Sequence, residues 1–218
     1  MHNVFVLRPF LMRVLVACEF SGAVRDAFAA LGHDAISCDL LPAEAPGPHY
    51  QGDVRDVLSD GWDLMVAHPP CTYLASSGLH WNKRRPERAR LTEEALEFVQ
   101  LLLDAPIARI ALENPIGCIS SRIRKPDQII HPWQFGHDAS KATCLWLKNL
   151  PALKPTDVLP GGREARRANQ TASGQNRLPP SKDRWKLRSL TYPAIAKAMA
   201  DQWGGDSRGG ALVRPCVI

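Results

Sequence analysis

The chain has 218 residues, 45% of them hydrophobic, and carries a formal net charge of +5 with a sequence pI of about 9.0. This length suits one domain with a substantial core. No apolar run approaches the roughly 20 residues of a membrane-spanning helix, which argues against an integral membrane protein. The excess of basic over acidic residues favours a polyanionic partner such as nucleic acid.

The cysteine pattern argues against a disulfide-rich secreted protein and against a common metal site. Because no two cysteines form a Cys-x-x-Cys pair, we expect a reducing, cytoplasmic location. A zinc set could be drawn from Cys118, His131, His137 and Cys144, but these spacings fit no common site and we expect no metal. Residues 1–12 lack a signal-peptide cleavage pattern and are expected to be an N-terminal extension.

The first apolar segments predict a cofactor-binding unit. Residues 13–18 are nearly all apolar, as in a parallel strand that is buried on both faces. A glycine turn leads into an expected helix over 23–31, and a second expected strand over 33–39 ends on Asp39. A helix start beside an acid at the end of the next strand is the general layout of an adenosine-cofactor site.

A reactive thiol is predicted where the next strand ends. Residues 63–67 predict a buried strand, and Pro69-Pro70-Cys71 follows it. Two prolines cannot continue a sheet ladder, so the chain must turn and present Cys71 at the carboxyl edge of the sheet. Open α/β proteins place their reactive groups at that edge. Cys71 is therefore a candidate nucleophile, and the alternative is a cysteine that only packs.

A second candidate catalytic group follows one strand–helix–strand unit later. Residues 79–90 are basic and contain Trp81, which suits either a solvated helix start or a functional basic surface. An amphipathic helix is expected over 91–103, and a buried strand over 107–112 ends in Glu113-Asn114-Pro115. A carboxylate at this edge could face the same crevice as Cys71.

The regular alternation fades after Ser120. A basic, loop-like stretch over 161–188 suits contact with a DNA phosphate backbone; the alternative is a disordered basic loop. A strand over 141–147 and a final helix over 193–203 are also expected. The expected organisation is a cofactor-binding core over 13–118, an irregular basic lobe over 119–190 with a reduced target-recognition role, a helix over 191–204 that completes the core, and a tail over 205–218.

Together these motifs resemble the DNA (cytosine-5)-methyltransferases, most closely the compact forms found in phages and prophages. The motifs that carry the resemblance, in order, are Phe20-Ser21-Gly22, Asp39, Gly52-Asp53-Val54, Pro69-Pro70-Cys71 and Glu113-Asn114-Pro115. The chain departs from the family at Thr72, where a glutamine commonly follows the cysteine. Its Arg122-Ile123-Arg124 segment begins only eight residues after Asn114, and a long target-recognition insert is missing.

The resemblance implies an α/β fold, namely a Rossmann-like three-layer sandwich on a mostly parallel sheet, and S-adenosylmethionine as cofactor. It implies that Cys71 adds to carbon 6 of a cytosine flipped out of duplex DNA or presented single-stranded, while Glu113 contacts ring nitrogen 3. The other implied catalytic residues are Arg122 and Arg124. The implied cofactor-binding residues are Phe20, Ser21 and Gly22 (methionine part), Asp39 (ribose), Asp53 and Val54 (adenine), and Pro69. The implied substrate-binding residues are Pro70, Thr72, Asn114, Arg163 and Arg184.

Three alternatives remain open from the sequence. The substrate could be a cytosine nucleotide rather than DNA. The transferred group could be a modified one-carbon or carboxymethyl group from a derivative of S-adenosylmethionine. The chain could also be a catalytically silent DNA-binding or inhibitory protein, although both candidate catalytic residues are present.

Overall fold

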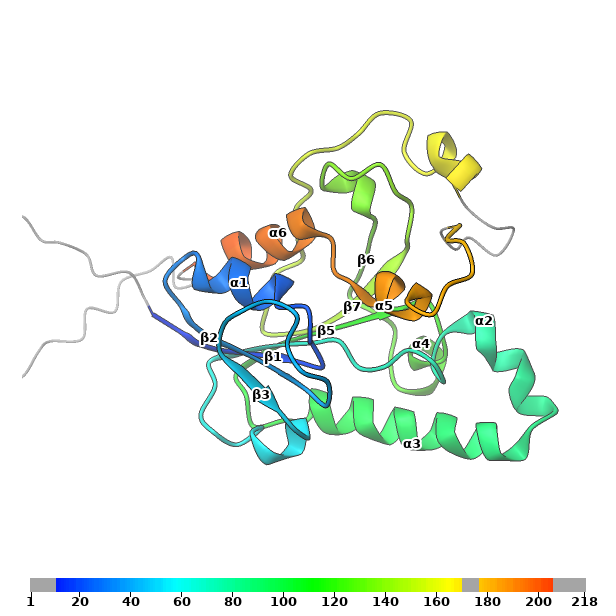
Figure 1. The fold of residues 1–218 in the computed structure, drawn as a ribbon, viewed down its shortest axis with the longest axis horizontal. Helices are drawn as coiled ribbons and strands as arrows, with labels where there is room; N and C mark the ends of the chain where they lie inside the picture. Colours follow the sequence, from blue (N-terminus) through cyan, green and yellow to red (C-terminus); the bar gives the residue numbers. More distant parts are fainter. Residues whose placement is uncertain (1–10, 170–176, 206–218) are drawn as a thin grey trace, which may run out of the picture.

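The computed structural model describes residues 11–169 and 177–205, and a seven-stranded sheet forms their centre (Figure 1). The strand order is β3-β2-β1-β4-β5-β7-β6. The strands are β1 (Arg13–Ala17), β2 (Asp34–Asp39), β3 (His49–Gln51), β4 (Leu64–Ala67), β5 (Arg109–Pro115), β6 (Gln128–Ile130) and β7 (Thr143–Lys148).

The sheet is mostly parallel, which confirms the predicted fold class. Strands β1 to β5 pair in parallel, and β7 lies antiparallel between β5 and β6. This is a Rossmann-like α/β fold. The strand order reverses between β1 and β4, and in such sheets ligands bind beyond the carboxyl ends of the strands at that reversal.

Helices cover both faces of the sheet because successive residues of the buried strands point to opposite sides. Helices α1 (Ala23–Ala29) and α6 (Pro193–Trp203) contact each other on the face that contains Val14 and Val16. Helix α3 (Pro86–Leu103) covers the face that contains Leu15 (Figure 1). The shorter helices are α2 (Ser76–Leu79), α4 (Ile119–Arg122), α5 (Arg184–Ser189), and the 3-10 turns η1 (Val54–Asp56), η2 (His80–Lys83), η3 (Pro132–Gln134) and η4 (Glu164–Asn169).

Several element boundaries differ from the predicted ones. Helix α3 begins at Pro86, five residues before the expected start, because a proline at the first helical position has no amide to satisfy. Strand β5 continues through Pro115, since its antiparallel pairing with β7 extends to Pro115–Thr143. Short strands β3 and β6, which the sequence analysis did not predict, extend the sheet at its two edges. The final helix is confirmed over 193–203.

The segment over 119–190 contributes more to the sheet than its irregular composition suggested. It supplies β6 and β7, and the expected basic loop over 161–188 contains η4 and α5. Met12, expected in an N-terminal extension, is fully buried against the α1–α6 face, so the core begins before β1. The remainder of that extension and most of the expected tail lie outside the described residues.

Within the described part of the chain, no helix is both long and apolar enough to cross a membrane.

Candidate active site

The loops that follow β4 and β5 are joined to each other along their backbones. Leu74 accepts a hydrogen bond from the Cys118 amide at 2.9 Å, and Ser76 donates its amide to the Ile116 carbonyl at 3.0 Å. Ala75 and Gly117 form a β-bridge between these two links. A β-carbon at position 117 would collide with the Leu74 carbonyl, so only glycine permits this approach. The loop that carries Cys71 is therefore held against the chain that follows Glu113.

Asn114 adds a side-chain link between the same two strand ends. It is buried, and its Nδ2 donates to the Pro69 carbonyl at 2.7 Å. Pro69 is buried, whereas Pro70, Cys71 and Thr72 are exposed beyond it. Asn114 thus fixes the turn from which Cys71 projects, and the site residues Pro69 and Asn114 contact each other directly.

Glu113 lies within β5 opposite Leu145 and accepts a hydrogen bond from His68 at 3.1 Å between Nδ1 and Oε2. Burial pushes the pKa of this carboxyl upward, but the His68 hydrogen bond, the Lys141 charge and the Thr143 hydroxyl outweigh burial, so the pKa is lowered. Glu113 is therefore an ionised carboxylate in the resting protein at neutral pH.

Cys71 is the exposed cysteine among those described, and its thiol is electrostatically coupled to Glu113. Desolvation of the sulfur raises the pKa of the thiol, and the Glu113 charge raises it further, while Lys141 and Arg188 oppose this. Coulombic effects of this kind require the charges to be close. The structure thus places the two predicted catalytic residues at neighbouring strand ends, on segments that are hydrogen-bonded to each other.

The turn after β1 is held by residues of its own. Glu19 is buried and its carboxylate accepts hydrogen bonds from the Val24 and Arg25 amides at 2.7 and 3.2 Å, while Ser21 donates its hydroxyl to Glu19 at 3.2 Å. Gly22 adopts a φ of 78°, and a β-carbon there would collide with the Arg25 guanidinium. Ser21 and Gly22 are therefore required for the fold of this turn. The Glu19 carboxylate already accepts hydrogen bonds from the amides at the start of α1.

Asp39 and Asp53 lie close together at the carboxyl end of β2, because the Gly52 amide donates to the Asp39 carbonyl at 3.0 Å. Asp39 and Asp53 both raise the pKa of Cys18 at the β1 end by their charge, after burial itself, which shows that they are close to it. One Asp39 oxygen accepts from the Leu41 amide at 2.9 Å. The other makes no hydrogen bond within the described residues and is available to a ribose hydroxyl.

Both residues predicted to bind the adenine, Asp53 and Val54, have structural roles. Val54 is buried in the core, so its side chain is not available to a ligand. Asp53 caps η1 through the Arg55 amide at 3.0 Å and pairs with the Arg55 guanidinium at 2.7 Å. The hydrogen bond from the Arg55 amide is the main reason that the pKa of Asp53 is lowered.

Helix α5 lies across the crevice between these two groups of residues. The Trp185 ring contacts the Phe20 ring at 6.0 Å between centroids, and Lys186 pairs with Glu44. At the other end, Lys141 donates its Nζ to the Arg188 carbonyl at 3.0 Å. The cavity beside Glu113 measures only about 20 Å³, room for a single water molecule, because residues 189–192 line it from the α5 side.

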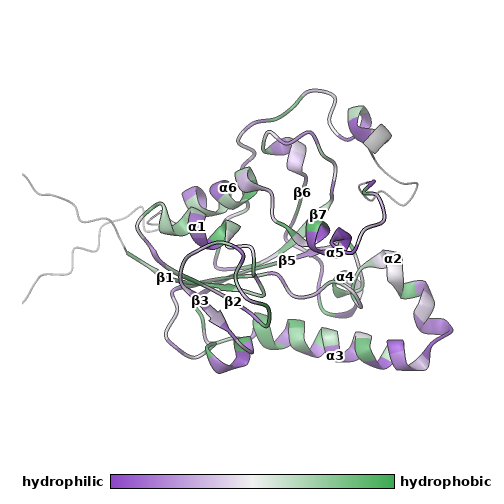
Figure 2. Ribbon diagram, in the orientation of Figure 1, coloured by the Kyte–Doolittle hydropathy of each residue, from purple (hydrophilic) through white to green (hydrophobic). Residues whose placement is uncertain are grey.

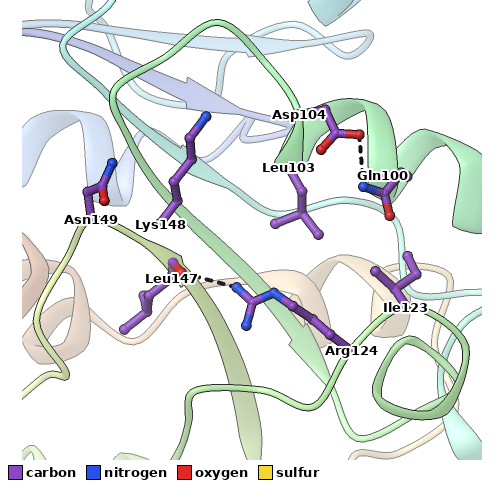
Figure 3. Close-up of a pocket in the computed structure, with 8 residues that line it drawn as sticks. All are labelled: Gln100, Leu103, Asp104, Ile123, Arg124, Leu147, Lys148 and Asn149. Atoms are coloured by element: carbon purple, nitrogen blue, oxygen red, sulfur yellow. Dashed lines mark hydrogen bonds between the residues drawn. The ribbon is translucent and has the colours of Figure 1, made fainter.

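Arg122 and Arg124, which the resemblance implied to be catalytic, are not brought to this crevice. Arg122 forms a two-pronged pair with Glu93 of α3 at 2.6 and 2.9 Å. Arg124 binds Asp127 at 2.7 Å and the Leu147 carbonyl at 3.1 Å (Figure 3). Leu147 pairs with Ala111, so Arg124 lies toward the amino end of β5. The geometry therefore does not support a catalytic role for Arg122 or Arg124.

Arg124 also lines a hollow of about 590 Å³ (Figure 3). This hollow lies at the end of α3, and Asp104 and Lys148 contribute to its wall. None of the other predicted site residues lines it. We therefore do not place the catalytic site in this hollow.

The two arginines predicted to contact substrate lie in the 161–188 region. Arg163 is exposed and close enough to His131 for its charge to help burial lower the pKa of that ring. Arg184 begins α5, and its buried Nε has no hydrogen-bond partner among the described residues. Neither arginine contacts Cys71 or Glu113 through a hydrogen bond described in the structure.

Three residues beside Glu113 were not singled out by the sequence analysis: His68, Lys141 and Thr143. His68 directly precedes Pro69-Pro70-Cys71, so its place next to the motif was the available signal. Lys141 and Thr143 reach Glu113 only through the antiparallel register of β5 and β7, in which Pro115 faces Thr143. No cluster of three metal-ligating side chains occurs in residues 11–169 and 177–205.

No protein-family model matches the chain. No curated protein matches it in sequence. Among solved structures, it is similar to the crystal structure of a candidate DNA modification methyltransferase encoded within a prophage of E. coli. The identity is 14%, the TM-score is 0.43, and the match covers 68% of this chain and 52% of that one, so the chain spans about half of that protein's length.

Proposed function

We propose that the protein methylates carbon 5 of cytosine in DNA, with S-adenosylmethionine as the methyl donor and Cys71 as the nucleophile. The observation that carries the proposal is that the loop presenting Cys71 is joined to the chain after Glu113 by backbone hydrogen bonds and a β-bridge, so that the Glu113 charge acts on the Cys71 thiol. The motifs of the cytosine-5 methyltransferases supply the same two residue types in the same order.

The proposed chemistry begins with addition of the Cys71 thiolate to carbon 6 of the cytosine. This addition pushes electrons onto ring nitrogen 3, which takes a proton from the Glu113 carboxyl, and makes carbon 5 nucleophilic. Carbon 5 would then take the methyl group that S-adenosylmethionine supplies when bound. A base removes the carbon 5 proton, nitrogen 3 returns its proton to the Glu113 carboxylate, and the Cys71–carbon 6 bond breaks to restore the thiolate and the aromatic ring.

The protonation state of Glu113 before DNA binds affects both Glu113 and the Cys71 thiol. Glu113 is ionised before the base arrives, so it must gain a proton to act on nitrogen 3. That proton comes from solvent, and His68, whose Nδ1 contacts the Glu113 carboxylate at 3.1 Å, keeps the carboxyl in position. In the same event the ionised charge beside Cys71 disappears, which lowers the pKa of the thiol and favours the thiolate. The two activations therefore depend on each other.

When bound, S-adenosylmethionine would supply an electrophilic methyl group. Phe20 and Asp39 are the residues that best fit its adenosine part, since both lie at the carboxyl edge of β1 and β2 and one Asp39 oxygen makes no hydrogen bond among the described residues. The cavity beside Glu113 is too small for a pyrimidine ring, so the segment over 184–192 has to move when DNA binds.

The test is nucleoside mass spectrometry of cytosine-containing DNA after incubation with the full chain and S-adenosylmethionine. We expect 5-methylcytosine with the native protein, none with Cys71→Ala, and a loss of at least about a hundredfold with Glu113→Gln. Arg122→Ala, which removes an exposed ion pair outside the crevice, serves as the matched control and should retain activity. Unmodified cytosine from the native protein would contradict the proposal, and a heavier adduct would identify a different transferred group.

A DNA strand containing 5-fluorocytosine gives a second readout. Its carbon 5 carries no removable proton, so the enzyme should remain covalently bound through Cys71. A stable complex that survives denaturation, mapped to Cys71 by peptide analysis, would separate this mechanism from direct methylation of an exocyclic nitrogen.

A further inference from the structure

An exposed basic and aromatic surface lies on the same segment that carries Cys71. We call it the Trp81 patch and define it as Trp81, Lys83, Arg84 and Arg85. It occupies η2 and the turn before α3, at the end of the molecule toward which β1 runs (Figure 1). Figure 2 shows this end as strongly hydrophilic. The proposed mechanism uses none of these residues.

Trp81 is 41% exposed, whereas most tryptophan side chains are largely buried. Its ring is flanked by His80, with the two ring centroids 4.8 Å apart. The guanidinium groups of Arg84 and Arg85 lie 5.9 and 5.3 Å from the ring centroid. The patch thus combines a partly exposed tryptophan ring with two guanidinium groups beside it.

The charges of the patch are not neutralised by the protein. Glu87 is the only acidic residue between Thr72 and Thr92 in the sequence. Among the ion pairs of the described residues, none involves Lys83, Arg84 or Arg85. Three unpaired cations around an exposed indole form a surface that attracts phosphates.

The patch is fixed to the Cys71 loop by the next arginine along the chain. Arg88 donates to the Thr72 carbonyl at 2.7 Å and to the Gly78 carbonyl at 3.3 Å, and its guanidinium lies 4.8 Å from the centroid of the Tyr73 ring. Thr92 accepts from Asn82 at 2.9 Å and donates to the Tyr73 carbonyl at 3.0 Å. The patch and the Cys71 loop therefore move as one unit.

We infer that the Trp81 patch binds a single-stranded stretch of DNA, with one unpaired base stacked on Trp81 and the flanking phosphates held by Arg84 and Arg85. Exposed aromatic rings among basic side chains bind single strands in this way, because every base offers a face for stacking. The inference rests on the proposed function in taking DNA as the substrate. A base extruded toward Cys71 leaves its partner base unpaired, and this patch lies on the segment that carries Cys71.

The test measures binding of a labelled single strand of about 12 nucleotides, and of the matching duplex, to the full chain by fluorescence anisotropy with cofactor omitted. Trp81→Ala should weaken single-strand binding about tenfold and duplex binding much less, and Trp81→Phe should restore most of the loss. Because no methyl transfer is measured, a failure of the proposed chemistry would leave this readout intact.

The charge part of the inference has its own matched control. Arg84→Ala/Arg85→Ala should reduce the slope of log affinity against log salt for the single strand by about 1.4. Lys154→Ala/Lys197→Ala removes the same charge from two exposed lysines elsewhere on the surface and should leave the slope unchanged. Single-strand binding that is unaffected by Trp81→Ala, or lost equally in both double variants, would overturn the inference. Circular dichroism of each variant verifies that it is folded.

Discussion

At the scale of single residues, the site is governed by the charges around one sulfur and one carboxylate. Burial and the Glu113 charge raise the pKa of the Cys71 thiol, whereas Lys141 and Arg188 lower it. Lys141 also helps to keep the pKa of Glu113 low. The raised pKa keeps the Cys71 thiol protonated at neutral pH, which limits its reaction with other electrophiles.

This balance predicts opposite effects from two substitutions. Glu113→Gln removes a negative charge beside the sulfur, so it should lower the pKa of Cys71. Lys141→Met removes a positive charge and should raise the pKa of Cys71. The measurement is the pH dependence of Cys71 alkylation by iodoacetamide, with the modified cysteine mapped by mass spectrometry.

Arg90→Met is a suitable control for the second substitution, because Arg90 pairs with Glu94 on α3 and does not appear among the charges that act on Cys71. Its alkylation profile should match that of the native protein. Shifts in the same direction for Glu113→Gln and Lys141→Met would contradict the electrostatic account.

His68 offers a second prediction at this scale. His68→Ala removes the hydrogen bond that holds the pKa of Glu113 down, and should destabilise the fold by about 2 kcal/mol at neutral pH. A carboxyl with a lowered native pKa stabilises the fold above its ordinary pKa, and this contribution disappears as pH falls through the native value. The stability difference between the native protein and the variant should therefore shrink in acid.

Urea unfolding at neutral pH and at about pH 3.5 measures this difference. His68→Asn keeps a side-chain N–H near Glu113 and should recover part of the lost stability without restoring the imidazole ring. A difference that is the same at both pH values would mean that His68 acts only by packing.

At the scale of elements, α5 is the part of the structure that joins the cofactor side of the crevice to the catalytic side. It rests on Phe20 through Trp185, on Glu44 through Lys186, and on Lys141 through the Arg188 carbonyl. It is only six residues long, and Trp185 and Leu187 remain more than half exposed. A short helix held by a few contacts can open at little cost in free energy.

If α5 closes over the bound cofactor, loss of its aromatic contact should weaken cofactor binding. Trp185→Ala removes the contact with Phe20 and should raise the dissociation constant of S-adenosylmethionine by about two- to tenfold, the range expected for one aromatic pair. Isothermal titration calorimetry measures the constant. Leu187→Ala is the matched control, since it truncates an exposed side chain of the same helix. Equal constants for Trp185→Ala and the native protein would show that α5 does not cover the cofactor.

At the scale of the whole molecule, the sheet buries both of its faces and each face has its own core. The α1–α6 side is completed by the last helix of the chain, where Met199 and Trp203 are buried against residues of β1 and β4. Trp203 also donates its indole N–H to the Pro151 carbonyl at 2.9 Å. Residues near both ends of the described chain are thus required for one core.

We therefore expect Met199→Ala to destabilise the protein by about 2–5 kcal/mol, because it leaves a cavity in a closely packed interior. Lys197→Ala on the exposed side of the same helix should change stability by no more than about 0.5 kcal/mol. Urea unfolding followed by far-ultraviolet circular dichroism measures both. A small effect of Met199→Ala would mean that α6 packs loosely on the sheet.

The sequence by itself determined the strands β1, β2 and β4, the helix α6 and the turn that presents Cys71. Apolar runs and prolines act on their own neighbourhood, so their effects can be read locally. The same local patterns indicated that Cys71 and Glu113 follow two strands whose carboxyl ends share an edge of the sheet.

Only the tertiary structure decided which side chains surround that pair. The antiparallel register of β5 and β7 brings Thr143 and Lys141 to Glu113, and no local pattern fixes a register between distant segments. Partners elsewhere on the surface direct Arg122 to Glu93 and Arg124 to Asp127, away from the crevice. The placement of α5 on Phe20 also depends on contacts between residues more than 160 positions apart. Long-range packing therefore completes a site whose reactive groups were already evident along the chain.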